Sequence, residues 1–310
     1  MSLPPIRIAS RASALALWQA HHVADLLRRV APDRTVEILH VSTAGDRNQA
    51  VALSTFGGFG VFTREVQKAV LEEQADLAVH SLKDLPTEPT PGLVLAAVPE
   101  REIVADAVVL PQGATPIGGL ADLPPNARIG TGSLRRRAQL LHVRPDLDLA
   151  EVRGNVDTRL RKLDSGEYAA LVLAGAGLVR LGLSARISLR LGPPTMLAAV
   201  GQGALGLECR AADTGLQGVL SLLNDRTAEA RVKAERSLLF TLRAGCHAPV
   251  GVDTQLQGDR LRLEAVVLSH DGQQRIHATG EAPAGDAVML GQAVAQTLLD
   301  QGAQQLMSPS

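Results

Sequence analysis

A strand-like apolar run ends in HSLKDLP, residues 80–86, where Ser81, Lys83 and Asp84 stand close together. In a sheet of parallel strands such an end is where ligands bind, and an aspartate there could transfer a proton or stabilise a cation. The alternative is an ordinary loop, whose Lys–Asp ion pair contributes little at a surface. The segment makes Asp84 a candidate catalytic residue.

The middle of the chain is rich in arginine. Residues 128–162 hold nine basic side chains against four acidic ones, whereas the whole chain has a net charge of −1, and only four of its 31 basic residues are lysines. The planar guanidinium binds a carboxylate or phosphate through two parallel hydrogen bonds, which an ammonium group cannot do. For Arg144 and Arg161 a solvated helix face is the favoured interpretation. Four others lie beside turns that could form an anion site: Arg135, Arg136, Arg153 and Arg159.

The two cysteines have different surroundings. Cys209 lies in the alternating run ALGLECR, which is typical of a buried strand. Cys246 follows a predicted helix end, where a thiol can be an exposed nucleophile or an inert loop residue. Pairing of Cys246 with His247 as nucleophile and base is disfavoured, because adjacent side chains usually point apart. The sequence shows no metal-ligand spacing and no phosphate-binding glycine motif.

The segment FGGFGVF, residues 56–62, holds three of the four phenylalanines among three glycines. Glycine allows backbone motion and phenylalanine provides an apolar cover, so the segment could close over a site as a lid. A turn packed on the core is an equal alternative. The candidate lid residues are Gly57, Gly58, Phe59, Gly60 and Phe62.

An alternation of short strands and helices must position these residues, and it is typical of a doubly wound α/β fold. Strands are predicted at 6–9, 36–41, 77–80, 94–98, 107–110, 128–130, 147–152 and 170–173, and helices at 13–30, 63–73, 133–143 and 156–163. Ser13 and Ser133 each follow a strand and a small-residue turn, as helix caps do. Free N–H groups at such a helix start favour an anion. Two such lobes facing each other would form a cleft lined by helix N-termini and arginines.

The last third predicts a small α+β domain. A helix over 227–243 is followed by strands at 250–256, 261–268 and 275–280 and a closing helix over 285–301. Hairpin turns are expected at Gly258-Asp259 and Asp271-Gly272. The sheet of this domain should therefore be antiparallel.

Composition limits the class of protein. The 310 residues are 45% apolar and 20% charged, as in a globular protein of about two or three domains. No apolar run reaches the roughly 18 residues of a membrane span, and the start MSLPPIRIAS lacks signal-peptide character, so we expect a cytoplasmic protein without a membrane partner. Net charge near zero and 2% aromatic residues argue against a nucleic-acid partner.

Seven motifs resemble the porphobilinogen deaminase (hydroxymethylbilane synthase) family, in the family's order: RIASRASALALWQAHHV, HSLKDLP, IGTGSLRRRAQL, RGNVDTRLRKL, LVRLGL, AVGQGALGLECR and AGCHAPVG. The resemblance covers nearly the whole chain. It implies a transferase of tetrapyrrole biosynthesis that joins four porphobilinogen molecules head to tail into hydroxymethylbilane and releases ammonia at each step. It also implies one covalent dipyrromethane cofactor per chain, bound by a thioether to Cys246, with Asp84 as the catalytic residue.

The same resemblance implies binding residues at both predicted helix starts and in the arginine-rich segment. Each pyrrole carries an acetate and a propionate, and charge-assisted hydrogen bonds of about 1.5–3 kcal/mol each can hold these groups. The implied substrate- and cofactor-binding residues are Arg11, Ser13, Gln19, Ser81, Lys83, Thr131, Ser133, Arg135, Arg136, Arg153, Gly154, Arg159, Arg180 and Gln202. No metal is implied. The chain has Ala44, Thr55, Phe59 and Gly132 where many bacterial relatives have arginine, lysine, lysine and serine, so the polar role of the glycine-rich segment is open.

The resulting prediction is an α/β enzyme with two doubly wound domains, like those of bilobal binding proteins, around a cleft and a small α+β C-terminal domain. The domains are residues 1–99 with 202–220, residues 100–201 and residues 221–310, the first completed by the strand ALGLECR after the chain returns. We expect a monomer that acts on the small molecule porphobilinogen. The rival hypothesis is a non-catalytic bilobal anion-binding module, which would carry no covalent group on Cys246 and would not need Asp84.

Overall fold

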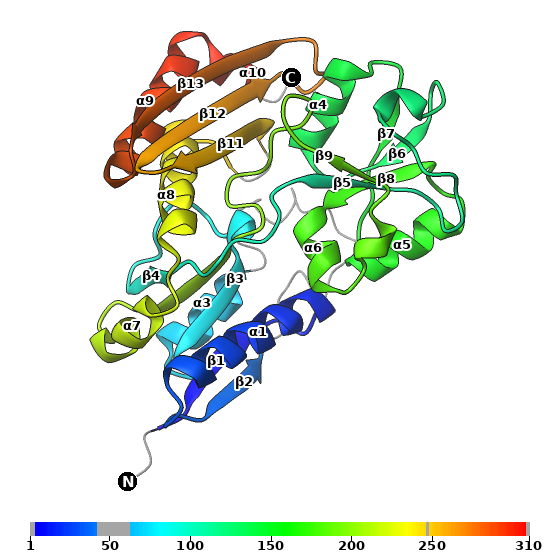
Figure 1. Ribbon diagram of the computed structural model, residues 1–310. Helices are drawn as coiled ribbons and strands as arrows, with labels where there is room; N and C mark the ends of the chain where they lie inside the picture. The colour runs from blue at the N-terminus through cyan, green and yellow to red at the C-terminus, as the bar shows by residue number, and fades with distance from the viewer. Residues whose placement is uncertain (1–3, 42–62, 246–247, 308–310) are drawn as a thin grey trace. The chain divides into compact units, whose positions relative to one another are not determined.

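The computed structural model describes residues 4–41, 63–245 and 248–307, which form three β-sheets with helices packed on them (Figure 1). The chain divides into two compact units. The first is Met1–Glu102 with Gly203–Val232, and the second is Ile103–Gln202 with Lys233–Ser310. Among the described residues, no helix is both long and apolar enough to cross a membrane.

The first unit contains a five-stranded sheet in the order β2-β1-β3-β10-β4. Its strands are β1 (Ile6–Ser10), β2 (Val36–His40), β3 (Leu77–Ser81), β4 (Leu93–Ala97) and β10 (Leu205–Arg210). Strands β1, β2 and β3 are parallel, whereas β10 runs antiparallel to both of its neighbours. The sheet is therefore mixed, and β10 enters it from a distant part of the sequence.

Helices cover both faces of this sheet. They are α1 (Ala14–Val30), α3 (Arg64–Leu71) and α7 (Thr214–Ser221), with a 3-10 turn η2 (Leu82–Asp84) after β3. Leu27 of α1 and Leu216 of α7 share one apolar core with Ile8. Val70 of α3 belongs to a second core with Ala9, the next residue of β1, whose side chain points to the opposite face. The doubly wound arrangement predicted for this part of the chain is confirmed.

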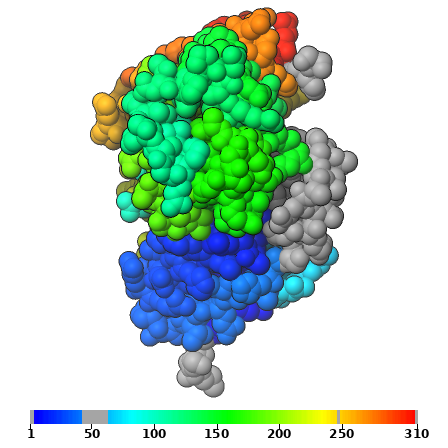
Figure 2. Space-filling view, turned by 90° about the vertical axis from the view of Figure 1, so that its right-hand side faces the viewer, coloured from blue at the N-terminus to red at the C-terminus, as the bar shows by residue number. Residues whose placement is uncertain are grey.

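Helix α1 and strand β2 each expose side chains to solvent. In the space-filling view the blue atoms of residues 4–40 form a continuous patch (Figure 2). Strand β2 lies at the edge of its sheet and contains no fully buried residue. Helix α1 buries one stripe, Gln19 to Leu27, and exposes the other.

The second unit contains two sheets, and the larger one repeats the plan of the sheet in the first unit, in the order β7-β6-β8-β5-β9. Its strands are β5 (Asp106–Val109), β6 (Arg128–Gly130), β7 (Asp148–Ala150), β8 (Ala170–Ala174) and β9 (Leu189–Leu191). Strand β6 is parallel to β7 and β8, and β5 is antiparallel to β8 and β9. Each sheet thus combines three neighbouring parallel strands with an inserted antiparallel one.

The second sheet is also covered on both faces. Its helices are α4 (Leu134–Val143), α5 (Val156–Asp164) and α6 (Gly175–Arg180), with 3-10 turns η3 (Leu120–Asp122) and η4 (Ser184–Arg186). Leu140 of α4 shares a core with Val108, whereas Leu163 of α5 and Leu178 of α6 share another with Ala107. Because Ala107 and Val108 are successive in β5, the two cores lie on opposite faces of the sheet.

The third sheet is antiparallel, in the order β11-β12-β13. Its elements are β11 (Val250–Gln257), β12 (Arg260–Leu268), β13 (Arg275–Pro283), η5 (Ala284–Asp286), α9 (Ala287–Asp300) and α10 (Ala303–Met307), preceded by α8 (Arg226–Thr241). A Cβ atom at Gly280 would lie 3.0 Å from both Leu290 and Val294, so this glycine lets α9 approach the sheet closely. The small α+β part predicted at the C-terminal end is confirmed.

Candidate active site

The carboxyl ends of β1 and β3 lie next to each other, because these strands are parallel neighbours with Ala9 opposite Ala78. Arg11 and Ser13 follow β1, and Ser81, Lys83 and Asp84 stand at the end of β3. The first unit therefore brings the predicted residues of two distant motifs to one edge of its sheet.

Helix α1 begins at this edge. Ser13 is its N-cap and accepts a hydrogen bond from the Ala16 N–H at 3.3 Å, as the sequence predicted. Gln19, one turn further, is buried, and its Nε2 donates to Ser81 Oγ at 2.7 Å. This bond fixes Ser81 against α1, so two of the implied binding residues support each other inside the unit.

Asp84 is exposed while the residues around it are anchored. Leu82 and Leu85 are buried, and the Leu82 N–H donates to the Ala204 carbonyl at 3.0 Å. The Asp84 carboxylate makes no hydrogen bond or ion pair with any residue that the structure describes. The backbone of the turn η2 is thus fixed, and the carboxylate oxygens of Asp84 are available to a ligand.

In the second unit, the predicted residues gather where β6, β7 and β8 end. Ser133 is the N-cap of α4 and accepts from the Arg136 N–H at 3.4 Å. Thr131 Oγ1 accepts from the Ser133 N–H at 3.3 Å. Arg180 is a buried residue of α6, which follows β8 directly. Helix α4 therefore starts at the carboxyl edge of its sheet, with the N–H groups of its first turn directed toward that edge.

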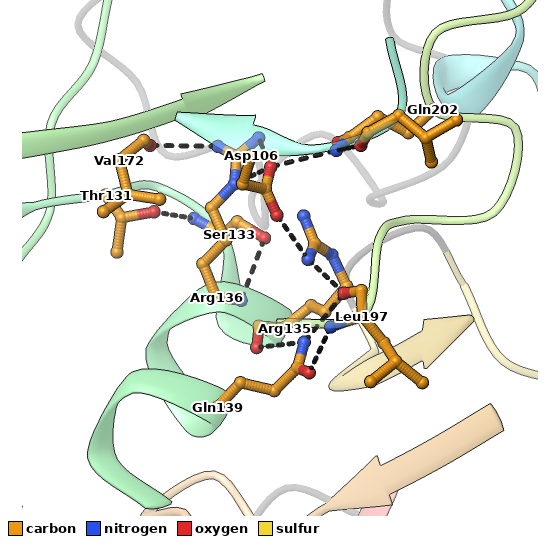
Figure 3. A network of polar contacts seen from close by, with 10 residues as sticks. Asp106, Thr131, Ser133, Arg135, Arg136, Gln139, Val172, Leu197 and Gln202 are labelled. Atoms are coloured by element: carbon orange, nitrogen blue, oxygen red, sulfur yellow. Dashed lines mark hydrogen bonds and ion pairs between the residues drawn. The ribbon is translucent and has the colours of Figure 1, made fainter. Parts of the chain in front are cut away.

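Arg135 and Arg136 are buried and share one carboxylate, that of Asp106 (Figure 3). Arg135 Nη1 donates to Asp106 Oδ2 at 2.8 Å, and Arg136 Nε donates to Oδ1 at 2.9 Å. Gln202, also buried, donates to the same Oδ1 at 3.0 Å. Burial alone would raise the pKa of Asp106, but the charges of the two arginines and these hydrogen bonds lower the pKa to about 2.

Asp106 was absent from the residues picked out in the sequence. The sequence indicates it only weakly, because Asp106 is simply the acidic first residue of the apolar strand β5. Because β5 is antiparallel to β8, the start of β5 lies at the edge where β8 ends, with Asp106 opposite Ala174. Only this pairing shows that the carboxylate faces the arginines of α4.

The remaining arginine positions follow β7. Arg153 is half-buried and forms an ion pair with Glu151, in which Arg153 Nη2 lies 2.7 Å from Glu151 Oε1. Arg159 Nε donates to the Gly154 carbonyl at 2.7 Å. Gly154 has φ of +105°, and a Cβ atom there would lie 2.8 Å from Thr158, so only glycine fits this turn. The turn that carries Arg153 is therefore fixed by its backbone, and Arg159 of α5 is hydrogen-bonded to that turn.

Several predicted residues lie outside the described part of the chain. These are Cys246, the lid residues Gly57, Gly58, Phe59, Gly60 and Phe62, and the divergent positions Ala44 and Thr55. Cys209, by contrast, is fully buried in β10, as predicted, and burial raises the pKa of its thiol to about 11. Within the described ranges, no group of His, Cys, Asp and Glu side chains could hold a metal ion.

Comparison with known families identifies the relatives of this chain. Residues 6–218 match the family model "Porphobilinogen deaminase, dipyromethane cofactor binding domain", and residues 229–300 match "Porphobilinogen deaminase, C-terminal domain". The chain belongs to the porphobilinogen deaminase family. It is 49% identical over 302 residues to the porphobilinogen deaminase of Gloeobacter violaceus, covering 97% of this chain and 92% of that protein. It is 45% identical to that of Maridesulfovibrio salexigens, covering 97% of each.

Among solved structures, the periplasmic VFT2 domain of Bordetella pertussis BvgS is 14% identical, with a TM-score of 0.41 over 70% of this chain and 85% of that one. The family resemblance of the seven motifs is confirmed by the family models. The described residues also fit a ligand that carries carboxylates, as a dipyrromethane does. Arg135 Nε is buried and donates to no acceptor among the described residues, and a guanidinium edge left open in this way is complementary to a carboxylate.

Proposed function

We propose that this chain is a porphobilinogen deaminase, a transferase that joins four porphobilinogen molecules head to tail into hydroxymethylbilane and releases ammonia at each step. Family membership over nearly the whole length supports this assignment. The structural observation that best supports the assignment is the position of the Asp84 carboxylate, which is exposed on the anchored turn η2 at the end of β3.

Asp84 has the position that the chemistry requires. Loss of ammonia from porphobilinogen needs a proton on the leaving amine and generates a methylene-pyrrolenine cation. An acid held at the reacting amine can supply the proton, and its carboxylate can stabilise the charge on the ring nitrogen. Leu82 and Leu85 are buried and hold the backbone on both sides of Asp84, which limits how far the carboxylate can move.

The second unit supplies groups that bind carboxylates. Ser133 and Thr131 stand at the start of α4, and Arg135, Arg153 and Arg159 carry the positive charge. We propose that these residues bind acetate and propionate groups of the pyrroles, and that Arg11, Ser13 and Lys83 of the first unit also bind such groups. A dipyrromethane bound to Cys246 would supply the terminal pyrrole to which the first substrate is joined. Arginine suits this task because its fork matches a carboxylate.

The test of the assignment is turnover of porphobilinogen by the purified chain and by Asp84→Asn and Asp84→Glu. Asparagine keeps the shape and loses the charge, so turnover should fall by about a hundredfold or more, whereas glutamate should retain weak activity. Asp25→Asn, which changes another exposed carboxylate of the same unit, should behave as wild type. Normal turnover by folded Asp84→Asn would show that this residue is not the catalytic acid.

Cofactor attachment is tested separately by intact mass. A thioether survives reductant, so the reduced chain should carry the mass of two linked pyrroles, and Cys246→Ala should lack it. The same measurement separates the enzyme from the rival anion-binding module, which is not favoured because both family models describe a deaminase. An unmodified mass in freshly purified, active protein would refute the attachment. We further propose a cytoplasmic monomer, to be checked by sedimentation and by cell fractionation.

A further inference from the structure

The middle of α4 carries a buried glutamine whose side-chain amide bonds to the backbone of another segment. Gln139 is 4% exposed, and its Oε1 accepts from the Leu197 N–H at 2.8 Å (Figure 3). Its Nε2 donates to the Leu197 carbonyl at 2.9 Å. The amide thus meets both polar backbone groups of one buried residue, as the facing residue of an antiparallel strand would. Through these two bonds α4 holds the segment at Leu197.

That segment is in turn joined to β11. The Ala198 N–H donates to the Val252 carbonyl at 3.0 Å, and the Val252 N–H donates to the Ala198 carbonyl at 2.8 Å. Gly251 stands beside this pair, and a Cβ atom there would lie 2.9 Å from Leu197 Cβ and 3.1 Å from Gln139 Nε2. The close approach of β11 to α4 therefore depends on this glycine.

The hairpin turn between β12 and β13 joins α4 to the same sheet at another place. A Cβ atom at Gly272 would lie 2.5 Å from the Ala138 carbonyl oxygen and 2.7 Å from the His142 nitrogen. His142 Nδ1 lies 2.9 Å from the Gly272 oxygen, at hydrogen-bond distance. Ala138 also shares an apolar cluster with Val266 and Leu268 of β12. Helix α4 is thus held to the β11-β12-β13 sheet through two separate contacts.

The two parts joined in this way carry different functional groups. Helix α4 starts at the Ser133 cap, where the predicted ligand-binding residues of the second unit gather. Strand β11 starts at Val250, four residues after Cys246 in the sequence. The Ala248 N–H donates to the Gly245 carbonyl at 2.9 Å, so the residues that flank this part of the chain are bonded to each other. The separation between the binding helix and the proposed attachment segment therefore depends on how firmly α4 is held to β11.

We propose that Gln139 is a positioning residue that locks α4 to β11 through Leu197, so that the binding helix and the strand after Cys246 stay one rigid body while the pyrrole chain grows. The inference rests on the proposed function for the identity of the ligand and for the thioether. A pyrrole chain fixed to the protein at one end and bound by α4 at another fits only one separation of the two. A rigid mounting provides that separation without a further loss of conformational freedom at each addition.

The first test compares KM for porphobilinogen between Gln139→Met and wild type. Methionine has nearly the same size but cannot bond to the Leu197 backbone, so α4 should no longer be held at one distance from β11. Loss of one charge-assisted hydrogen bond to the ligand corresponds to about ten- to a hundredfold in affinity, so KM should rise by about tenfold or more. If Gln139 only stabilised the fold, fewer folded molecules would lower the apparent kcat and leave KM unchanged.

The matched control is Gln217→Met. Gln217 lies on α7 of the first unit, and its Nε2 likewise donates to backbone carbonyls, those of Arg210 and Ala211. Because these bonds are remote from α4 in the fold of the first unit, this variant should keep the KM of wild type. Equal KM values in Gln139→Met and Gln217→Met would refute the positioning role.

The rigid body itself is tested by cross-linking. Ala198 and Val252 form a hydrogen-bonded antiparallel pair. The Cα atoms of such a pair ordinarily lie about 5.5 Å apart, within the range that a disulfide spans. The full chain with Ala198→Cys and Val252→Cys, carrying its cofactor, is oxidised and assayed before and after reduction. The oxidised protein should form hydroxymethylbilane as fast as the reduced protein. An oxidised protein that stalls and recovers on reduction would overturn the proposal.

The two hypotheses fail in different ways. If the wild-type chain does not turn over porphobilinogen, the proposed function is wrong, and the contact is still decided by hydrogen exchange of the purified chain. The amides of Leu197, Ala198 and Val252 should then exchange as slowly as those in the core of α4, and Gln139→Met should speed exchange at Leu197. Fast exchange at these amides in wild type would refute the rigid contact. If wild type turns over porphobilinogen and Gln139→Met keeps its KM, the function stands and the positioning role is refuted.

Discussion

Gly206 of β10 packs against Leu82, two residues before Asp84, and we predict that it thereby helps to fix the position of Asp84. A Cβ atom at Gly206 would lie 2.5 Å from Leu82 Cδ1 and 3.1 Å from Leu95 Cδ1. Carbon atoms in contact ordinarily lie about 3.5–4.0 Å apart, so in Gly206→Ala the Leu82 side chain must retreat by roughly 1 Å. Leu82 is 1% exposed, so its side chain has little room to turn aside, and we expect the turn η2 to shift with it.

The expected cost has two parts. Overpacking a buried site destabilises a protein by about 1–3 kcal/mol, which should appear as a lower denaturation midpoint in urea. A catalytic group displaced by about 1 Å can lose about a hundredfold in rate, and Asp84 lies only two residues after Leu82. We therefore expect kcat for porphobilinogen to fall by about ten- to a hundredfold with little change in KM, because the displaced group acts in the transition state.

Gly218→Ala is the matched control. Gly218 lies in α7 of the same unit, and a Cβ atom there meets nothing within 4 Å. Alanine is the better helix former by about 1 kcal/mol, so this variant should be as stable as wild type or more stable, with full activity. Equal kcat and equal stability in Gly206→Ala and Gly218→Ala would refute the argument that β10 fixes the position of Asp84.

Two further predictions concern charge and thiol chemistry. Burial opposes ionisation of Asp76, but hydrogen bonds from Arg7 and Arg210 lower its pKa to about 2. A lowered pKa stabilises the fold above about pH 4 and is lost as pH falls toward 2, so Asp76→Asn should cost about 1–2 kcal/mol at pH 7 and flatten the acid limb of stability. An unchanged acid limb in urea titrations would contradict this. If Cys246 carries the proposed thioether, a thiol reagent should find no reactive cysteine in the native holoprotein, because Cys209 is buried with a raised pKa. One reactive thiol, that of Cys209, should appear on unfolding. Two reactive thiols after unfolding would contradict the thioether.

Much of the fold follows from local sequence patterns. Helix α1 was predicted to begin at Ser13 because a capping serine precedes a long amphipathic run, and the structure has this cap. Strands β11, β12 and β13 follow from alternating residues between hairpin turns such as Gly272, which has φ of +74°. These elements are set by neighbours in the chain, so the sequence determines them directly.

The elements missed by the sequence depend on packing. Helix α6 has the sequence GAGLVR, with two glycines that disfavour a helix. It forms because Ala176 and Leu178 are buried, and Leu178 shares a core with residues of β8 and α5. Helix α7 and the short strand β9 are likewise fixed by the sheets they cover or extend. Local propensity is too weak in these segments to show them.

The order of strands and the partners of buried charges belong to the tertiary structure alone. Sequence patterns identified the candidate residues Asp84, Arg135 and Arg136, because their types and motif spacing are visible in the chain. They did not reveal Asp106, which reaches Arg135 across 29 residues only because β5 inserts antiparallel beside β8. Nor did they show that Arg136 directs its Nε at this carboxylate, whereas Arg135 Nε has no acceptor among the described residues. Burial makes such a pairing obligatory, and burial is a property of the folded chain.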